Sequence, residues 1–191
     1  MSLCIVGLGK LGYPMAEFLS TSGENISCYD INQELVAELN SGNNPLKFEK
    51  YISEFISNSN PLKFFFNLDE ALKNSDMCFI TVPTPSDKDG AFSNSFIMKV
   101  FDDIADYLKS YKKNSRNPYI IVINSTVSPG SIDNEFVPYL EQKGLVNSDD
   151  FCIIYNPYFV ALGDVLNGLK FPDLILIGCQ NEYAKNKILN L

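Results

Sequence analysis

Six short, mainly apolar runs constrain the fold of this chain more than any other feature of its sequence. The runs cover residues 3–6, 26–29, 77–82, 119–123, 152–155 and 174–178. A strand with one face in water alternates apolar and polar residues, whereas a strand buried on both faces is apolar throughout. Because the runs are separated by longer helical patterns, parallel crossover connections are expected. The sequence therefore predicts an α/β fold, a doubly wound parallel sheet in three layers.

Apolar residues at helical spacing fill most of the intervals between the runs. Helices are expected after Gly12, over residues 35–39 with Gly42 as the stop, and over residues 70–74, 96–111 and 131–143. Pro138 must kink or shorten the last of these helices. The least regular stretch covers residues 40–66, and the only helix expected there lies over residues 50–57. No repeat or linker interrupts the pattern, so residues 1–191 are expected to form one domain.

Composition restricts the chemistry that such a fold could perform. Lys and Arg number 15 against 23 Asp and Glu, and the net charge of −8 argues against nucleic acid as a partner. The chain has no His, which excludes Ser-His-Asp and Cys-His catalysis and His-based zinc sites. The five Cys are widely spaced inside apolar runs, so we expect reduced core side chains of a cytoplasmic protein, without a metal site. No run approaches the ~20 apolar residues that cross a bilayer, and no secretory signal is evident.

A glycine-rich turn lies between the first apolar run and the first helix. It consists of Gly7, Leu8, Gly9, Lys10, Leu11 and Gly12. Gly7 would allow the tight turn, Gly9 would let a pyrophosphate approach the backbone, and Gly12 would let the helix pack close to the strand. The helix N-terminus offers free N–H groups and positive partial charge to phosphates.

Asp30 ends the second apolar run, 18 residues beyond Gly12. An acid at this place accepts hydrogen bonds from the adenosine ribose hydroxyls in Rossmann-like dinucleotide-binding domains. Its charge would repel a 2′-phosphate, and no Arg follows it, so we favour NAD over NADP. The alternative is a glycine-rich turn that binds no ligand.

Two further turns follow buried runs, where ligands of open parallel sheets bind. The first consists of Val82, Pro83, Thr84 and Pro85, and the second begins with Asn124, Ser125, Thr126 and Val127. Thr84 could hold its hydroxyl toward a cofactor, although the first segment could equally be a plain turn. Ser125 and Thr126 could bind a cofactor ribose or orient a water, or they could cap the helix that follows.

A fourth segment begins with Tyr155, Asn156, Pro157, Tyr158 and Phe159 and continues to the run over residues 174–178. By itself, this pattern predicts a strand, a proline turn and another strand.

Taken in this order, the four motifs resemble the amino-terminal domain of the UDP-glucose/GDP-mannose dehydrogenase family, from Leu3 to about Gly178. Members oxidise a nucleotide-sugar alcohol to a carboxylate in two NAD-dependent steps. The resemblance implies that Thr84, Ser125 and Thr126 line the nicotinamide side of an NAD site. It also implies a catalytic role for Thr126, which would help to position the hydrolytic water. The substrate side would include Tyr158 and Phe159.

The chain departs from the family pattern in ways that affect catalysis. Tyr158 stands where the family has a Glu, Leu162 replaces a second acid, and Asn124 replaces a Lys. The chain ends at Leu191, before the family's central and UDP-binding domains, which carry the catalytic Lys and Cys. The resemblance therefore implies a domain that is inactive alone and forms a homo-oligomer only with those domains.

Two other interpretations remain open. The joint loss of both acids would suit a catalytically dead NAD-binding or interaction module. Alternatively, the same fold could belong to a 3-hydroxyacyl-CoA or 6-phosphogluconate type of dehydrogenase, which shares the glycine-rich strand–turn–helix.

Overall fold

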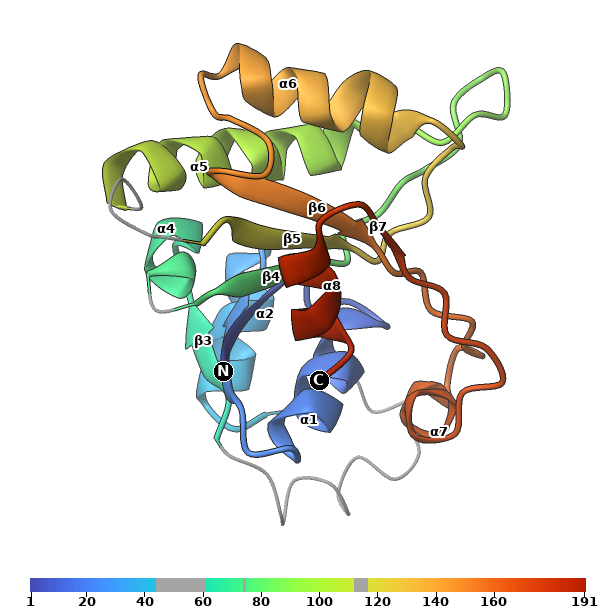
Figure 1. Cartoon of the computed structure of the whole chain (residues 1–191). Coiled ribbons are helices and arrows are strands. Elements are labelled where there is room, and N and C mark those ends of the chain that lie inside the picture. Colours follow the sequence, from blue (N-terminus) through green and yellow to red (C-terminus); the bar gives the residue numbers. More distant parts are fainter. Residues whose placement is uncertain (44–60, 74, 112–116) are drawn as a thin grey trace.

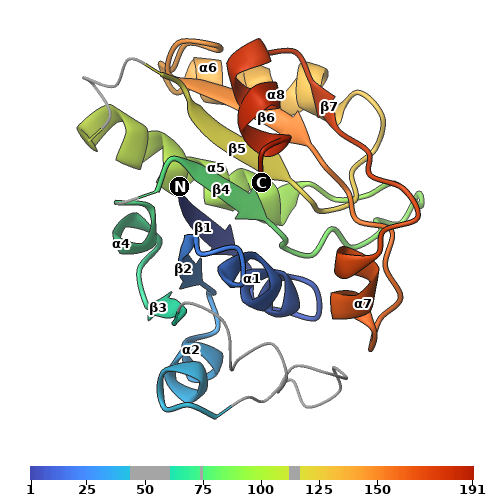
Figure 2. The same ribbon diagram turned by 60° about the horizontal axis from the view of Figure 1, so that its bottom comes forward.

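The structure is a computed structural model that describes residues 1–43, 61–73, 75–111 and 117–191. Within these residues, seven strands form one sheet in the order β3-β2-β1-β4-β5-β6-β7 (Figures 1 and 2). The strands are β1 (Ser2–Val6), β2 (Asn25–Tyr29), β3 (Lys63–Phe65), β4 (Met77–Ile80), β5 (Tyr119–Ile123), β6 (Phe151–Tyr155) and β7 (Gly178–Cys179). All pairs are parallel except β6 with β7. The doubly wound sheet is thus confirmed, with one antiparallel edge strand.

Helices cover both faces of this sheet, as predicted. One face carries α1 (Gly12–Ser20), α2 (Gln33–Asn40), α7 (Val165–Lys170) and α8 (Glu182–Ile188). The other carries α4 (Leu68–Leu72), α5 (Ser95–Tyr111), a π-helix η1 (Ile132–Phe136) and α6 (Val137–Gln142). In Figure 1, α5 and α6 lie above the sheet, and α1, α7 and α8 lie below it. The helix expected over residues 50–57 lies outside the described residues.

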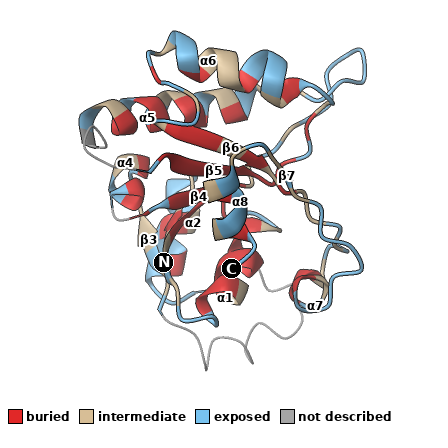
Figure 3. Ribbon diagram, viewed as in Figure 1, coloured by how far each residue is buried: buried red, intermediate tan, exposed pale blue. Residues whose placement is uncertain are grey.

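Two apolar clusters, one on each face of the sheet, explain why the central strands are apolar throughout. In β1, Cys4 and Val6 belong to the cluster under α5, while Leu3 and Ile5 belong to the cluster over α1. The other central strands divide their residues in the same way, and Figure 3 shows them almost entirely buried. All five Cys are free, and the predicted place in the core is confirmed for Cys4, Cys28, Cys78 and Cys152, whereas Cys179 is only half-buried.

The prediction of a buried strand over residues 174–178 is wrong. Only Gly178 and Cys179 pair with β6, and the preceding run lies outside the sheet, with Leu174 56% and Ile175 62% exposed. This run forms part of the exposed connection at the edge of the molecule in Figure 3. An apolar run indicates that a segment suits burial, but it does not identify the surface that would cover it.

Pro138 is accommodated by a change of helix type. Since proline lacks an N–H group, it cannot donate the next α-helical hydrogen bond. The turn before it is a π-helix, in which the N–H of Val137 donates to the carbonyl of Ile132, five residues back. The α-helical part is therefore shortened to the residues from Val137 onward, as the sequence predicts. No helix in the described part of the chain is both long and apolar enough to cross a bilayer.

Candidate functional site

The glycine-rich turn and the proline turn lie side by side in space. The first follows β1 and the second follows β4, and these two strands are neighbours at the place where the strand order reverses. In open α/β sheets, ligands bind at this switch point, beyond the carboxyl ends of the strands. The structure therefore brings the two motifs to one edge of the sheet.

The three glycines of the first turn differ in what the fold requires of them. Gly7 has φ +96°, a conformation that L side chains rarely adopt. A Cβ on Gly12 would lie 1.8 Å from the carbonyl oxygen of Gly7, so only glycine fits at the start of α1. Gly9 has neither constraint, because nothing lies within 4 Å of an ideal Cβ there. The missing Cβ of Gly9 leaves open space in front of the backbone.

The first turn of α1 suits an anion. Its N-cap, Leu11, makes no side-chain cap hydrogen bond, and the first turn contains no acidic residue. Helix N-termini attract phosphates through free N–H groups and positive partial charge. In α1, the N–H of Tyr13 donates to the carbonyl of Gly9 at 3.3 Å and Pro14 has none, so a phosphate can use only N–H groups before Tyr13. Lys10 is exposed beside them, whereas the side chain of Leu8 is fully buried. Leu8 can therefore contribute only through its backbone.

Asp30 is fixed by two backbone N–H groups. Leu8 donates to its Oδ2 at 2.6 Å, and Asn32 donates to its Oδ1 at 2.8 Å. Each carboxylate oxygen retains a further acceptor position. The carboxylate is thus held beside the glycine turn with capacity left for hydroxyl donors, which fits the predicted contact with a ribose.

The turns after β4 and β5 are tied together by two hydroxyl groups. Ser125 donates to the carbonyl of Val82 at 2.6 Å, and Thr84 donates to the carbonyl of Thr126 at 2.6 Å. The hydroxyls of Ser125 and Thr84 therefore donate their hydrogen atoms to protein carbonyls, and toward a cofactor they can act only as acceptors. The side chain of Thr126 is exposed. Neither Ser125 nor Thr126 caps the next helix, whose N-cap is Ser131.

Two asparagines connect the ends of β5 and β6 to the segment before β7. Asn124 donates its side-chain amide to the carbonyl of Asn156 at 2.6 Å, and Asn156 donates its own to the carbonyl of Leu176 at 2.8 Å. Asn124 is only 3% exposed, and its Oδ1 has no hydrogen-bond partner among the described residues. An amide here thus orders the turn that begins at Asn156, whereas a Lys would place a charge in a buried position.

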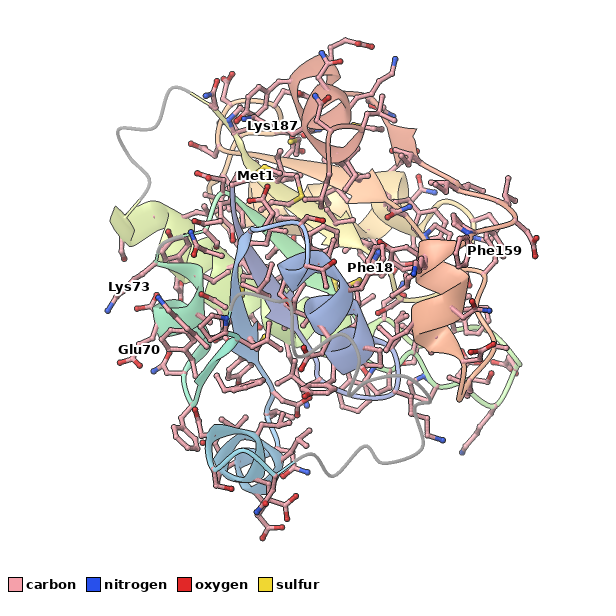
Figure 4. All side chains as sticks on the ribbon, turned by 90° about the horizontal axis from the view of Figure 1, so that it is seen from below. Met1, Phe18, Glu70, Lys73, Phe159 and Lys187 are labelled. Carbon is pink, nitrogen blue, oxygen red and sulfur yellow. The ribbon has the colours of Figure 1, made fainter. Side chains whose placement is uncertain are left out.

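Tyr158 packs against the apolar cluster on the α1 side of the sheet. Burial raises the pKa of its phenol to about 12, so it cannot accept a proton at neutral pH. Phe159, next to α7 in Figure 4, is 56% exposed, and Leu162 is exposed as well. The turn therefore presents apolar side chains where the family pattern has acids.

Thr81 contacts the glycine turn, although the sequence analysis did not single it out. Its hydroxyl donates to the carbonyl of Gly7 at 2.6 Å and lies 3.1 Å from that of Val6. The available signal was a polar residue at the end of the apolar run over residues 77–82.

Comparisons with known proteins agree with this geometry. The model of the "UDP-glucose/GDP-mannose dehydrogenase family, NAD binding domain" matches residues 1–191. UDP-glucose 6-dehydrogenase of Rickettsia bellii is 30% identical over 97% of this chain and 41% of its own length. GDP-mannose 6-dehydrogenase of Pseudomonas syringae is 30% identical over 93% of this chain and 40% of its own length.

Solved structures show the same relation. A ternary complex of GDP-mannose dehydrogenase from Pseudomonas aeruginosa has a TM-score of 0.89 at 26% identity, over all of this chain and 43% of that one. UDP-glucose dehydrogenase from Pyrobaculum islandicum has a TM-score of 0.87 at 26% identity, over 99% of this chain and 43% of that one. The chain spans about two fifths of the length of these relatives. It belongs to the UDP-glucose/GDP-mannose dehydrogenase family, of which it is the NAD-binding domain.

Proposed function

We propose that this chain is the cofactor-binding part of a nucleotide-sugar 6-dehydrogenase, which oxidises a sugar alcohol to a carboxylate. The chain spans about two fifths of the length of its relatives, and in this proposal the domain alone is inactive. The backbone of residues 7–12 holds the diphosphate of NAD, and the carboxylate of Asp30 accepts hydrogen bonds from the adenosine ribose. The family match favours this proposal over a hydroxyacyl-CoA or phosphogluconate type of enzyme.

The observation that carries the proposal is the space in front of Gly9. Gly7 and Gly12 are needed for the fold, but a Cβ at Gly9 would meet no protein atom within 4 Å. The fold does not require a glycine at this position, and the helix N-terminus beside it has no side-chain cap. Both features suit the close approach of a ligand's phosphates.

The nicotinamide end lies on the β4–β5 side of the site in this proposal. Val82 and Pro83 border it, Thr84 and Ser125 act as acceptors, and the exposed Thr126 faces the reaction and helps to position the hydrolytic water. The substrate, a nucleotide sugar, approaches from the side of Tyr158 and Phe159. We further propose a cytoplasmic protein that forms a homo-oligomer only in its full-length form and binds neither nucleic acid nor membrane.

Calorimetric titration of the folded chain with NAD and NADP tests the cofactor site. We expect weak binding of NAD and weaker binding of NADP, because the charge of Asp30 repels a 2′-phosphate. Asp30→Asn should weaken NAD binding about tenfold. The matched control is Asp150→Asn. Asp150 also accepts a backbone N–H at 2.8 Å, but it precedes β6, at the amino end of the strand, whereas the proposed site lies beyond the carboxyl ends of the strands. Absence of heat at millimolar NAD, with the fold intact, would refute the site.

A second candidate function is a catalytically dead NAD-binding or interaction module. It is favoured by the turn after β6, where the pKa of Tyr158 is raised to about 12 and Leu162 is exposed in place of acids. Such a module would bind NAD but would transfer no hydride.

The full-length gene product decides between the two functions. Formation of NADH with a UDP- or GDP-sugar supports the enzyme, whereas NAD binding without NADH formation supports the module. If the enzyme is correct, Tyr158→Glu should raise turnover by restoring a carboxylate. An unchanged or lower rate, with the fold intact by circular dichroism, would mean that Tyr158 does not occupy the position of the family acid.

A further inference from the structure

The peptide group that joins Gly7 to Leu8 is held at both ends by side chains from the two strands that flank β1. Its carbonyl accepts a hydrogen bond from the hydroxyl of Thr81, after β4, at 2.6 Å. Its N–H donates to Oδ2 of Asp30, after β2, also at 2.6 Å. Figure 2 shows β2, β1 and β4 side by side. One peptide plane therefore links the side chain that follows β4 to the carboxylate that follows β2.

The position of the Thr81 hydroxyl depends on the absence of a side chain at Gly12. A Cβ there would lie 2.5 Å from Thr81 Oγ1, so the hydroxyl uses the space that this glycine leaves. The backbone of Thr81 is fixed as well, because its N–H donates to the carbonyl of Val6 at 2.9 Å. The hydroxyl is thus a fixed donor aimed at the glycine turn.

Asp30 depends on the same peptide for one of its two backbone contacts. Its Oδ1 is held by the N–H of Asn32 at 2.8 Å, and its Oδ2 is held only through the Gly7–Leu8 peptide among the hydrogen bonds of the described residues. Gly7 adopts φ +96° and has no Cβ to restrict rotation of this peptide. Without a donor to its carbonyl, the peptide loses one of its two side-chain anchors, and the contact that orients Oδ2 of Asp30 is weakened.

We propose that Thr81 is a positioning residue for the NAD site, acting through the Gly7–Leu8 peptide on Asp30. The inference rests on the proposed function, since it concerns the same site. Thr81 itself touches no part of the cofactor. It keeps the phosphate-binding turn and the ribose-binding carboxylate in one arrangement before NAD enters, which lowers the entropy lost on binding.

Isosteric variants test this role by calorimetric titration with NAD and with ADP-ribose, which lacks the nicotinamide end. Thr81→Val removes the hydroxyl, and we expect the Kd for both ligands to rise about tenfold. Thr81→Ser restores the hydroxyl and should restore the Kd to within about twofold of the wild type. The control is Thr21→Val, because Thr21 also donates to a carbonyl at 2.6 Å, that of Phe18, but at the far end of α1. It should leave both Kd values unchanged.

The link to Asp30 is tested by a double-mutant cycle with Asp30→Ala. If Thr81 acts through that carboxylate, Thr81→Val should change the Kd much less in the Asp30→Ala background than in the wild type. Equal effects in both backgrounds would refute the link, and equal Kd values for wild type and Thr81→Val would refute the whole inference. Failure of the wild type to bind NAD would instead refute the proposed function. If Thr81→Val does not fold, Thr81→Ala removes the same donor without added bulk.

Discussion

Replacing Gly12 by Ala should destabilise the fold, because the new Cβ has no space. It would lie 1.8 Å from the backbone carbonyl oxygen of Gly7 and 2.5 Å from the hydroxyl of Thr81. Relaxed Cβ contacts are not shorter than 3.0 Å, so α1 or the turn must shift by about 1.2 Å. Overpacking of this kind costs about 3 kcal/mol, and loss of the Thr81 hydrogen bond costs about 1 kcal/mol. Since Ala favours a helix over Gly by about 1 kcal/mol, the net loss is about 3 kcal/mol.

Thermal unfolding measures this loss directly. For a chain of this size, about 3 kcal/mol corresponds to a fall in Tm of about 6–12 °C. The matched control is Gly9→Ala, two residues from Gly7, where the Cβ meets nothing within 4 Å and Tm should change by less than about 1 °C. The same control should weaken NAD binding about tenfold, because its methyl group stands where a phosphate approaches. A Gly12→Ala protein that melts with the wild type would refute the tight contact between α1 and the turn.

Three further substitutions test the packing and the charges. Burial raises the pKa of Glu17, so its ionised form lowers stability at neutral pH. Glu17→Gln should therefore raise Tm by a few degrees at pH 8. This gain should vanish as the pH falls below about 4, where the carboxyl group is protonated in the folded and the unfolded chain alike. The hydroxyl of the fully buried Tyr119 lies 2.6 Å from Ser75 Oγ. Tyr119→Phe removes this hydrogen bond and should lower the free energy of unfolding, measured in urea, by about 1–2 kcal/mol. An unchanged urea midpoint would contradict the bond. Hydrogen bonds from Lys143 and a tyrosine lower the pKa of Asp102, so the stability it adds is present above about pH 4 and is lost in acid. Asp102→Asn should therefore cost about 0.5 kcal/mol at pH 7 and nothing at about pH 2, and an equal cost at both values would refute the ion pair.

The central sheet could be predicted from the sequence because β1, β4, β5 and β6 are largely buried on both faces and β2 is buried on one. Five of the six apolar runs lie in β1, β2, β4, β5 and β6. Gly42, with φ +81°, follows α2 as the predicted stop. These features are local, so spacing and residue type are enough to reveal them.

The edge elements could not be predicted, because their structure depends on neighbours distant in the sequence. β3 has three half-exposed or exposed residues, and its pairing with β2 defines it. Helices α7 and α8 are short and gave no strong periodicity. The run over residues 174–178 is as apolar as a central strand, yet only its last residue joins the sheet.

The candidate site shows the same division. The glycine turn and Asp30 have a recognisable spacing, and the structure brings them together. The role of Thr81 was hidden, because a Thr at the end of an apolar run is also an ordinary strand residue. The hydrogen bonds of Thr84 and Ser125 to the opposite turn could not be foreseen either, since they join residues 42 and 43 positions apart.

The crossed hydroxyl bonds between the turns after β4 and β5 hold these two turns together on one side of the proposed NAD site. Ser125 and Thr84 each reach the carbonyl of the opposite turn, so neither turn can swing without breaking a bond. On the other side of the proposed site, the glycine turn is held to Asp30 by the N–H of Leu8, so both sides are fixed before a dinucleotide enters. The position of the joined turns after β4 and β5 therefore sets where the far end of a bound dinucleotide comes to rest.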